Sequence, residues 1–176
     1  MMMKREQKGS GSVRVLLVDE SSVALQGVKA ALAAQNRTMV VGTACSADGA
    51  HAAIRAWQPH VVVLEVVIGG ASGISLCQTI RESHPHVGVL FFTAVDDAHL
   101  LRAAIAAGAQ GYLLKAASCE ALLKSIEAVA IGRAVIDPGL TSQVLSWIRE
   151  RKRVAPRWSR ADSSDKDLKF HSYVSS

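Results

Sequence analysis

The sequence predicts an α/β fold in which a parallel sheet is covered by helices on both faces. Five short runs rich in Val, Leu and Phe alternate with helical patterns: Val13–Val18, Met39–Ala44, Val61–Glu65, Val87–Phe92 and Gly111–Leu114. Several runs are apolar throughout, which is typical of strands buried on both faces of a parallel sheet. Five strand–helix units joined by right-handed crossovers predict a doubly wound five-stranded sheet in the order 2-1-3-4-5, with five flanking helices.

The segments between these runs carry apolar residues three or four positions apart, which is the helical period. These stripes are Leu25, Val28 and Leu32; Ile74, Cys77 and Ile80; Leu101, Ala104 and Ile105; and Leu122, Ile126 and Val129. The predicted helix starts are capped by Ser21 or Ser22, by Asp96 and by Ser118. Gly108 and Gly132 follow two predicted helix ends, where glycine is the favoured residue.

The chain has 176 residues, 49% of them hydrophobic, which suits a single domain with a sizeable core. The predicted organisation has four parts: a flexible N-terminal tail at 1–12, the folded domain at 13–137, a short helix at 138–150, starting near Leu140, and a basic and polar linker or tail at 151–176. The last part contains too little apolar surface to fold alone. It shows no recognisable output domain.

The net charge of +5 belongs to the ends of the chain. Residues 1–14 carry +3 and residues 149–176 carry +4, whereas residues 15–148 carry −2. A basic DNA-binding face on the folded domain is therefore not expected. The basic run at 149–160, which includes Trp158, either contacts nucleic acid or is a solvated linker.

Three observations predict a cytoplasmic protein without a membrane anchor. No apolar run approaches the roughly 20 residues of a membrane span. The start of the chain has no apolar stretch of the kind found in secretory signals. The three cysteines, Cys45, Cys77 and Cys119, are far apart and odd in number, which indicates reduced thiols and neither a disulfide framework nor a zinc site.

Polar residues follow the predicted strands, and in this sheet order they meet in a crevice beyond the carboxyl ends of the first and third strands. They are Asp19 and Glu20, Glu65, Thr93 and Lys115. Carboxylates suit Mg²⁺, a lysine offsets a phosphoryl group or a carboxylate, and a carboxylate between them could be a nucleophile. The alternative is that all five are ordinary solvated residues at strand ends.

Residues 13–20, 59–65, 91–94 and 108–115 together resemble the receiver domain of two-component response regulators. The resemblance covers about residues 13–137, and the most similar branch is the one that precedes LuxR-type helix-turn-helix domains. It implies a flavodoxin-like (CheY-like) fold. It also implies roles for the site residues. Asp19 and Glu20 would be the metal-binding acidic pair, and the main-chain carbonyl of Val67 would be the third metal ligand. Thr93 would be the switch hydroxyl, Tyr112 the switch aromatic ring and Lys115 the phosphoryl-binding lysine.

Two departures from the family pattern concern the phosphoacceptor. The family has an aspartate where this chain has Glu65, and the loop that follows usually reads Met-Pro-Gly-Met-Asp-Gly, where this chain has residues 68–73, Ile-Gly-Gly-Ala-Ser-Gly. The added methylene moves the carboxylate by more than ~1 Å, enough to cost about 10²-fold where attack geometry is tight. Gly69 also replaces a proline and is expected to loosen the loop. Glu65 is therefore predicted not to accept a phosphoryl group, and Mg²⁺ to bind weakly or not at all.

These features predict a signalling module of a transcription-regulating pathway and not an enzyme, with no catalytic residues. The implied partners are a sensor histidine kinase, a second copy of the chain and a DNA-binding output domain or protein. The dimer face would be the first and last helices or the fourth–fifth strand-helix face. The domain is predicted to stay in one signalling state, with Glu65 imitating phosphorylation, or else in a resting, inactive state.

Two other functions remain alternatives. The first is a conventional phosphorylatable receiver whose DNA-binding output domain is missing from this chain, because the Leu-Thr-x-Arg-Glu opening of that domain is not found. The second is a flavin- or nucleotide-binding enzyme of the same architecture. That enzyme needs a phosphate-binding loop rich in Gly, Ser or Thr after the first strand, whereas residues 19–22 read Asp-Glu-Ser-Ser, which repels phosphate.

Overall fold

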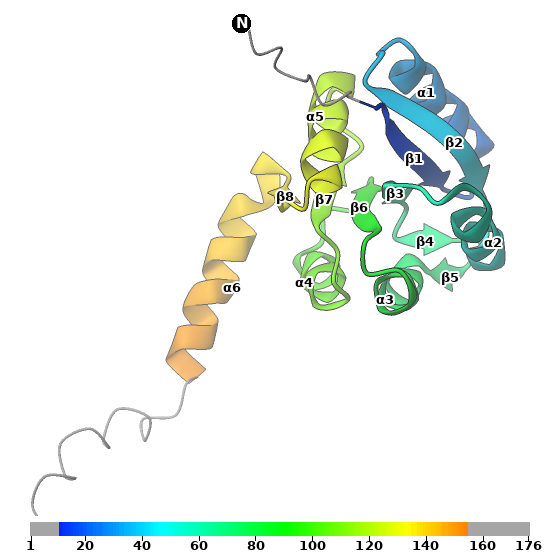
Figure 1. The fold of residues 1–176 in the computed structure, drawn as a ribbon. Helices are drawn as coiled ribbons and strands as arrows, with labels where there is room; N and C mark the ends of the chain where they lie inside the picture. The colour runs from blue at the N-terminus through cyan, green and yellow to red at the C-terminus, as the bar shows by residue number, and fades with distance from the viewer. Residues whose placement is uncertain (1–10, 155–176) are drawn as a thin grey trace, which may run out of the picture. The chain divides into compact units, whose positions relative to one another are not determined.

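The computed structural model describes residues 11–154, with side chains up to residue 150, so the predicted tails lie largely outside the described residues. Its main sheet is parallel throughout, with the order β2-β1-β3-β6-β7-β8 (Figure 1). The strands are β1 (Val13–Val18), β2 (Thr38–Ala44), β3 (Val61–Leu64), β6 (Gly88–Thr93), β7 (Gly111–Leu114) and β8 (Val135–Ile136). The first five confirm the predicted order 2-1-3-4-5.

Helices cover both faces of this sheet. They are α1 (Ser22–Ala33), α2 (Ala47–Trp57), α3 (Gly73–Ser83), α4 (Ala98–Ala106) and α5 (Cys119–Ala130). Figure 1 shows α1 and α5 on one face and α2, α3 and α4 on the other. Ser21 and Ser118 cap helices as predicted, but the cap of α4 is Asp97 and not Asp96, because Asp97 Oδ1 accepts the N–H groups of His99 and Leu100.

The core on the α1–α5 face consists of alternate strand residues and the inner stripes of these two helices. Its buried members are Val15, Leu17, Leu32, Val61, Val63, Leu90, Leu113, Leu122, Leu123, Ile126 and Val129. Burying a Val or Leu side chain contributes about 1.5–3 kcal/mol. The apolar strands therefore fix the positions of their carboxyl ends, where the polar residues lie.

A sixth strand was not predicted. The two-residue strand β8 pairs with β7, and the buried carboxylate of Asp137 continues that pairing. Its Oδ2 accepts the N–H of Leu114 at 3.1 Å, its Oδ1 accepts the N–H of Gly139 at 2.8 Å, and its own N–H donates to the carbonyl of Tyr112 at 2.8 Å. A short 3₁₀ helix, η1 (Pro138–Leu140), follows and places Leu140 in the core.

The segment after β3 is a β-hairpin. Strands β4 (Val67–Ile68) and β5 (Ala71–Ser72) pair antiparallel across Gly69 and Gly70. Both glycines have positive φ, 56° and 78°, which is the requirement of the type I′ turn that closes two-residue hairpins. The residues that follow β3 therefore form a hairpin that this glycine turn closes.

Helix α6 (Thr141–Val154) belongs, from Ser142 onward, to a second unit. It extends four residues beyond the predicted end at Glu150. Two of its apolar side chains, Leu145 and Ile148, are exposed. No described helix combines the length and apolar character that a membrane crossing requires.

Candidate functional site

Four strands deliver polar side chains to the carboxyl edge of the sheet. Asp19 directly follows β1, Glu65 follows β3, Thr93 is the last residue of β6 and Lys115 follows β7. Because these strands are neighbours in the order β1-β3-β6-β7, these four of the five predicted residues reach one edge of the sheet. Asp19 and Thr93 are buried, and Glu65 and Lys115 are partly buried.

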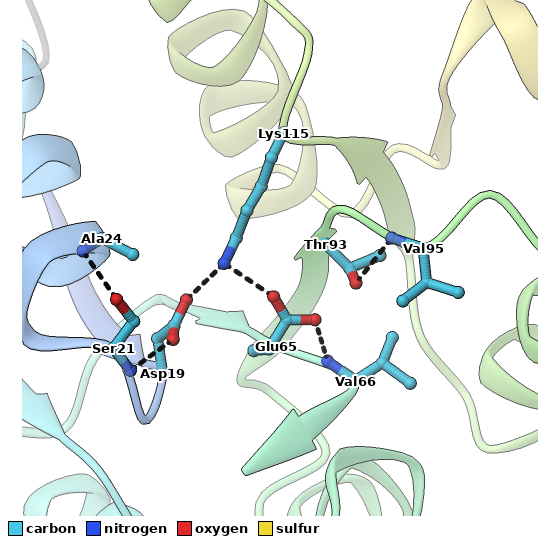
Figure 2. A network of polar contacts seen from close by, with 8 residues as sticks. All are labelled: Asp19, Ser21, Ala24, Glu65, Val66, Thr93, Val95 and Lys115. Carbon is cyan, nitrogen blue, oxygen red and sulfur yellow. Dashed lines mark hydrogen bonds and ion pairs between the residues drawn. The ribbon is translucent and has the colours of Figure 1, made fainter.

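The Lys115 ammonium bridges two of the carboxylates (Figure 2). Its Nζ lies 2.6 Å from Asp19 Oδ2 and 2.7 Å from Glu65 Oε2. Burial alone would lower the pKa of Lys115, but the hydrogen bonds and negative charges of Asp19 and Glu65 outweigh it, so the pKa is raised. Lys115 therefore stays charged between the two carboxyl groups.

The remaining oxygen of each bridged carboxylate accepts a backbone N–H. Ser21 N donates to Asp19 Oδ1 at 2.8 Å, and Val66 N donates to Glu65 Oε1 at 2.7 Å. The second acidic residue of the predicted pair, Glu20, contacts the hairpin, where its Oε2 accepts the N–H of Gly69 at 2.8 Å. Glu20 is exposed and is not brought into the bridge.

This arrangement leaves neither bridged carboxylate with an oxygen that lacks an N–H donor and is open to Mg²⁺. Mg²⁺ requires close to octahedral oxygen ligation at about 2.0–2.1 Å. Both oxygens of Asp19 and of Glu65 already accept N–H donors, and the described residues hold no group of three or more His, Cys, Asp or Glu side chains placed around a common metal position. Val67, predicted to supply a carbonyl ligand, lies in β4 with its side chain about half exposed.

Thr93 and Tyr112 meet at the backbone of Val95 and not at Glu65. The Thr93 hydroxyl accepts the N–H of Val95 at 3.2 Å, and the Tyr112 hydroxyl donates to the carbonyl of Val95 at 3.0 Å. The Tyr112 ring is 1% exposed and lies 6.0 Å, between centroids, from the ring of Phe91. Thr93 and Tyr112, the two predicted switch residues, therefore bind the backbone N–H and the carbonyl of Val95, which lies in the loop between β6 and α4.

Tyr112 predicts a loss of stability at high pH. Its burial, followed by the negative charges of Glu65, Asp97 and Asp96, raises the pKa of its hydroxyl from 10.0 to about 12. A raised folded-state pKa contributes stability that is complete below pH about 10 and is lost as pH rises through about 12. We expect tyrosinate absorbance to appear late in an alkaline titration, coincident with unfolding. Tyr112→Phe should remove that late component, and an ordinary titration of Tyr112 would contradict the expectation.

Several partners in this site carry no signal in the sequence. Val66, Gly69 and Val95 contribute only backbone N–H or carbonyl groups, which every residue except proline offers. Ser21 was expected as a helix cap and also donates its N–H to Asp19. A hairpin signal could have been found, because adjacent glycines between apolar residues favour a type I′ turn.

Known proteins resemble this chain over most of its described length. A family model described as "Response regulator receiver domain" matches residues 15–127. The transcriptional regulatory protein LnrK of Bacillus subtilis (strain 168) is 28% identical over 141 residues, which are 80% of this chain and 64% of LnrK. The DNA-binding transcriptional activator DevR/DosR of Mycobacterium tuberculosis is 31% identical over 137 residues, 78% of this chain and 63% of that protein. The aligned part thus spans less than two thirds of these relatives.

Solved structures agree with this assignment. A crystal structure of a two-component response regulator of the LuxR family, from Aurantimonas sp. SI85-9A1, superimposes with a TM-score of 0.74 at 26% identity and covers 79% of this chain and 99% of that one. The receiver domain of the putative response regulator NarL from Mycobacterium tuberculosis gives a TM-score of 0.66 at 30% identity, with 69% of this chain covered and 98% of that one. With well over half of its length matched by the family model, the chain belongs to the response regulator receiver domain family.

Proposed function

We propose that this receiver domain acts as a protein-interaction module in the regulation of transcription and does not accept a phosphoryl group on Glu65. The observation that carries the proposal is the engagement of both Glu65 oxygens, one by the Lys115 ammonium and one by the N–H of Val66. In-line attack needs a carboxylate oxygen at near-attack distance from phosphorus, with positive charge already on the phosphoryl oxygens. Here the lysine that would bind the phosphoryl group is bound to the nucleophile itself.

The same contacts support a single signalling state. The Glu65 carboxylate contacts the Lys115 ammonium, and Thr93 and Tyr112 fix the β6–α4 loop through Val95. A partly buried ion pair contributes only part of the few kcal/mol by which two states of such a domain differ. The bias toward one state is therefore incomplete, and a partner that prefers that state adds to it.

The proposed partner is a second copy of the chain, bound through α1 and α5. A groove of about 260 Å³ runs between these helices, with small or apolar side chains along it, including Ala24, Ala31 and Leu122. Val23, next to it on α1, is 81% exposed. The relative DevR/DosR is named as a DNA-binding transcriptional activator, so a DNA-binding domain or protein is the proposed output. A sensor histidine kinase would contact the domain without transferring a phosphoryl group.

The test combines intact mass with light scattering. The wild type is incubated with acetyl phosphate and Mg²⁺, and its mass and oligomeric state are measured before and after. We expect no phosphoryl adduct and an unchanged dimer. An adduct that disappears in Glu65→Ala would overturn the proposal and indicate a conventional phosphorylatable receiver. A monomer at high concentration would overturn the dimer.

A further inference from the structure

The ammonium of Lys115 lies where two strands bring carboxylates together. Asp19 arrives from β1 and Glu65 from β3, and Figure 2 shows the lysine reaching between them from β7. An ammonium has three N–H donors and a compact charge. Two of those donors are directed at carboxylates from two different strands, so the lysine joins β1, β3 and β7 at the carboxyl edge of the sheet.

We propose that Lys115 supplies the positive charge that a divalent cation supplies in related receiver domains, and that it thereby keeps divalent cations out of this site. This inference rests on the proposed function, and it adds which group offsets the negative charge of the carboxylates in the site. It makes the fold and the charge state of the site independent of Mg²⁺.

Competition for the same oxygens is the first argument. A divalent cation bound between these carboxylates would compete for Asp19 Oδ2 and Glu65 Oε2, the two oxygens that Lys115 holds at 2.6 and 2.7 Å. The ammonium and the cation would also repel each other strongly at a separation of a few ångström. The other oxygen of each carboxylate already accepts a backbone N–H, so neither side chain offers an oxygen without a donor.

The two departures from the family sequence act together in this arrangement. The Glu65 carboxylate, one methylene farther from the backbone than that of an aspartate, contacts the Lys115 ammonium at 2.7 Å. The Gly69–Gly70 turn presents the Gly69 N–H to Glu20, which directs the second acidic residue of the expected metal pair toward the hairpin at 2.8 Å. Glu65 is thus paired with Lys115, and Glu20 is held by the backbone N–H of Gly69.

Titration with Mn²⁺, followed by the loss of the free-ion electron paramagnetic resonance signal, tests the proposal. Wild type is compared with Lys115→Met and Lys115→Gln. The matched control is Lys124→Met, because Lys124 also holds a carboxylate, that of Glu120 at 2.7 Å, but on the exposed surface of α5. We expect wild type and Lys124→Met to bind Mn²⁺ so weakly that the titration does not saturate. Both Lys115 variants should reach saturation, with a dissociation constant at least about tenfold below the lower limit set for wild type, since two carboxylates lose their counter-charge.

Adding Asp19→Ala to either Lys115 variant should abolish the gained binding, which locates the cation. Lys115→Gln keeps hydrogen-bond donors for the carboxylates and serves if Lys115→Met does not fold. Saturable binding by the wild type that Asp19→Ala removes would overturn the proposal, as would folded Lys115 variants that bind no more tightly than wild type. Mass measurement of the phosphoryl adduct is independent of this result. Tight wild-type binding without an adduct defeats only this inference, and an adduct without tight binding defeats only the proposed function.

Discussion

Glu65→Asp is expected to take up one phosphoryl group from acetyl phosphate in the presence of Mg²⁺, where the wild type takes up none. Shortening the side chain by one methylene withdraws the carboxylate by more than ~1 Å, a change that can alter rates about 10²-fold where attack geometry is tight. It also lengthens the 2.7 Å contact to Lys115, which frees the ammonium to bind phosphoryl oxygens. Asp19 and the new aspartate would then face each other across a position open to Mg²⁺.

Two controls make this measurement specific. Glu120→Asp makes the same deletion at an exposed glutamate on α5 and should leave the protein unmodified. The Glu65→Ala protein should take up no phosphoryl group. The Glu65→Asp protein should take up none when Mg²⁺ is left out. If the folded Glu65→Asp protein remains unmodified, the added methylene of Glu65 is not the main obstacle to phosphoryl transfer. The hydrogen bond between Glu20 and Gly69 is then the next contact to remove by mutation.

The sequence was sufficient to predict the site because the architecture determines which strand ends meet. Continuous apolar runs identify buried parallel strands, and parallel strands deliver their following residues to one edge. Asp19, Glu65 and Lys115 are therefore close in space although 96 residues separate the first from the last. The bridge between them also follows from charge, since two carboxylates and one ammonium are present at that edge.

The remaining features could not be predicted because they depend largely on the positions of backbone N–H and carbonyl groups. Strand β8 has two residues, too few for a periodic signal, and it is held by backbone groups and the Asp137 carboxylate. The hydroxyl of Thr93, the predicted switch hydroxyl, accepts the N–H of Val95, a group that any residue except proline would offer at that position. Glu20 likewise follows the Gly69 amide, whose direction is a property of the turn.

Gly73→Ala is expected to destabilise the domain by about 3 kcal/mol, at the upper end of the effects of overpacking. A methyl group at this position would lie 2.1 Å from the carbonyl oxygen of Glu65 and 2.9 Å from that of Val66. Both are backbone atoms at the end of β3, and the Gly73 N–H already donates to the Val66 carbonyl at 2.7 Å. Helix α3 must therefore move away from the sheet, or the backbone of Glu65 must move with it.

Urea unfolding, followed by circular dichroism at a fixed low protein concentration, measures this change through the transition midpoint. Gly27→Ala is the matched control at a concentration where the chain is monomeric, because Gly27 lines the α1–α5 groove and a methyl group there meets nothing within 4 Å in the single chain. It should stabilise the helix by roughly 0.5–1 kcal/mol, since alanine loses less backbone entropy than glycine. An unchanged midpoint for Gly73→Ala would show that the start of α3 is free to separate from β3. In that case the close approach at Gly73 would not be what holds the Glu65 backbone in position for Lys115.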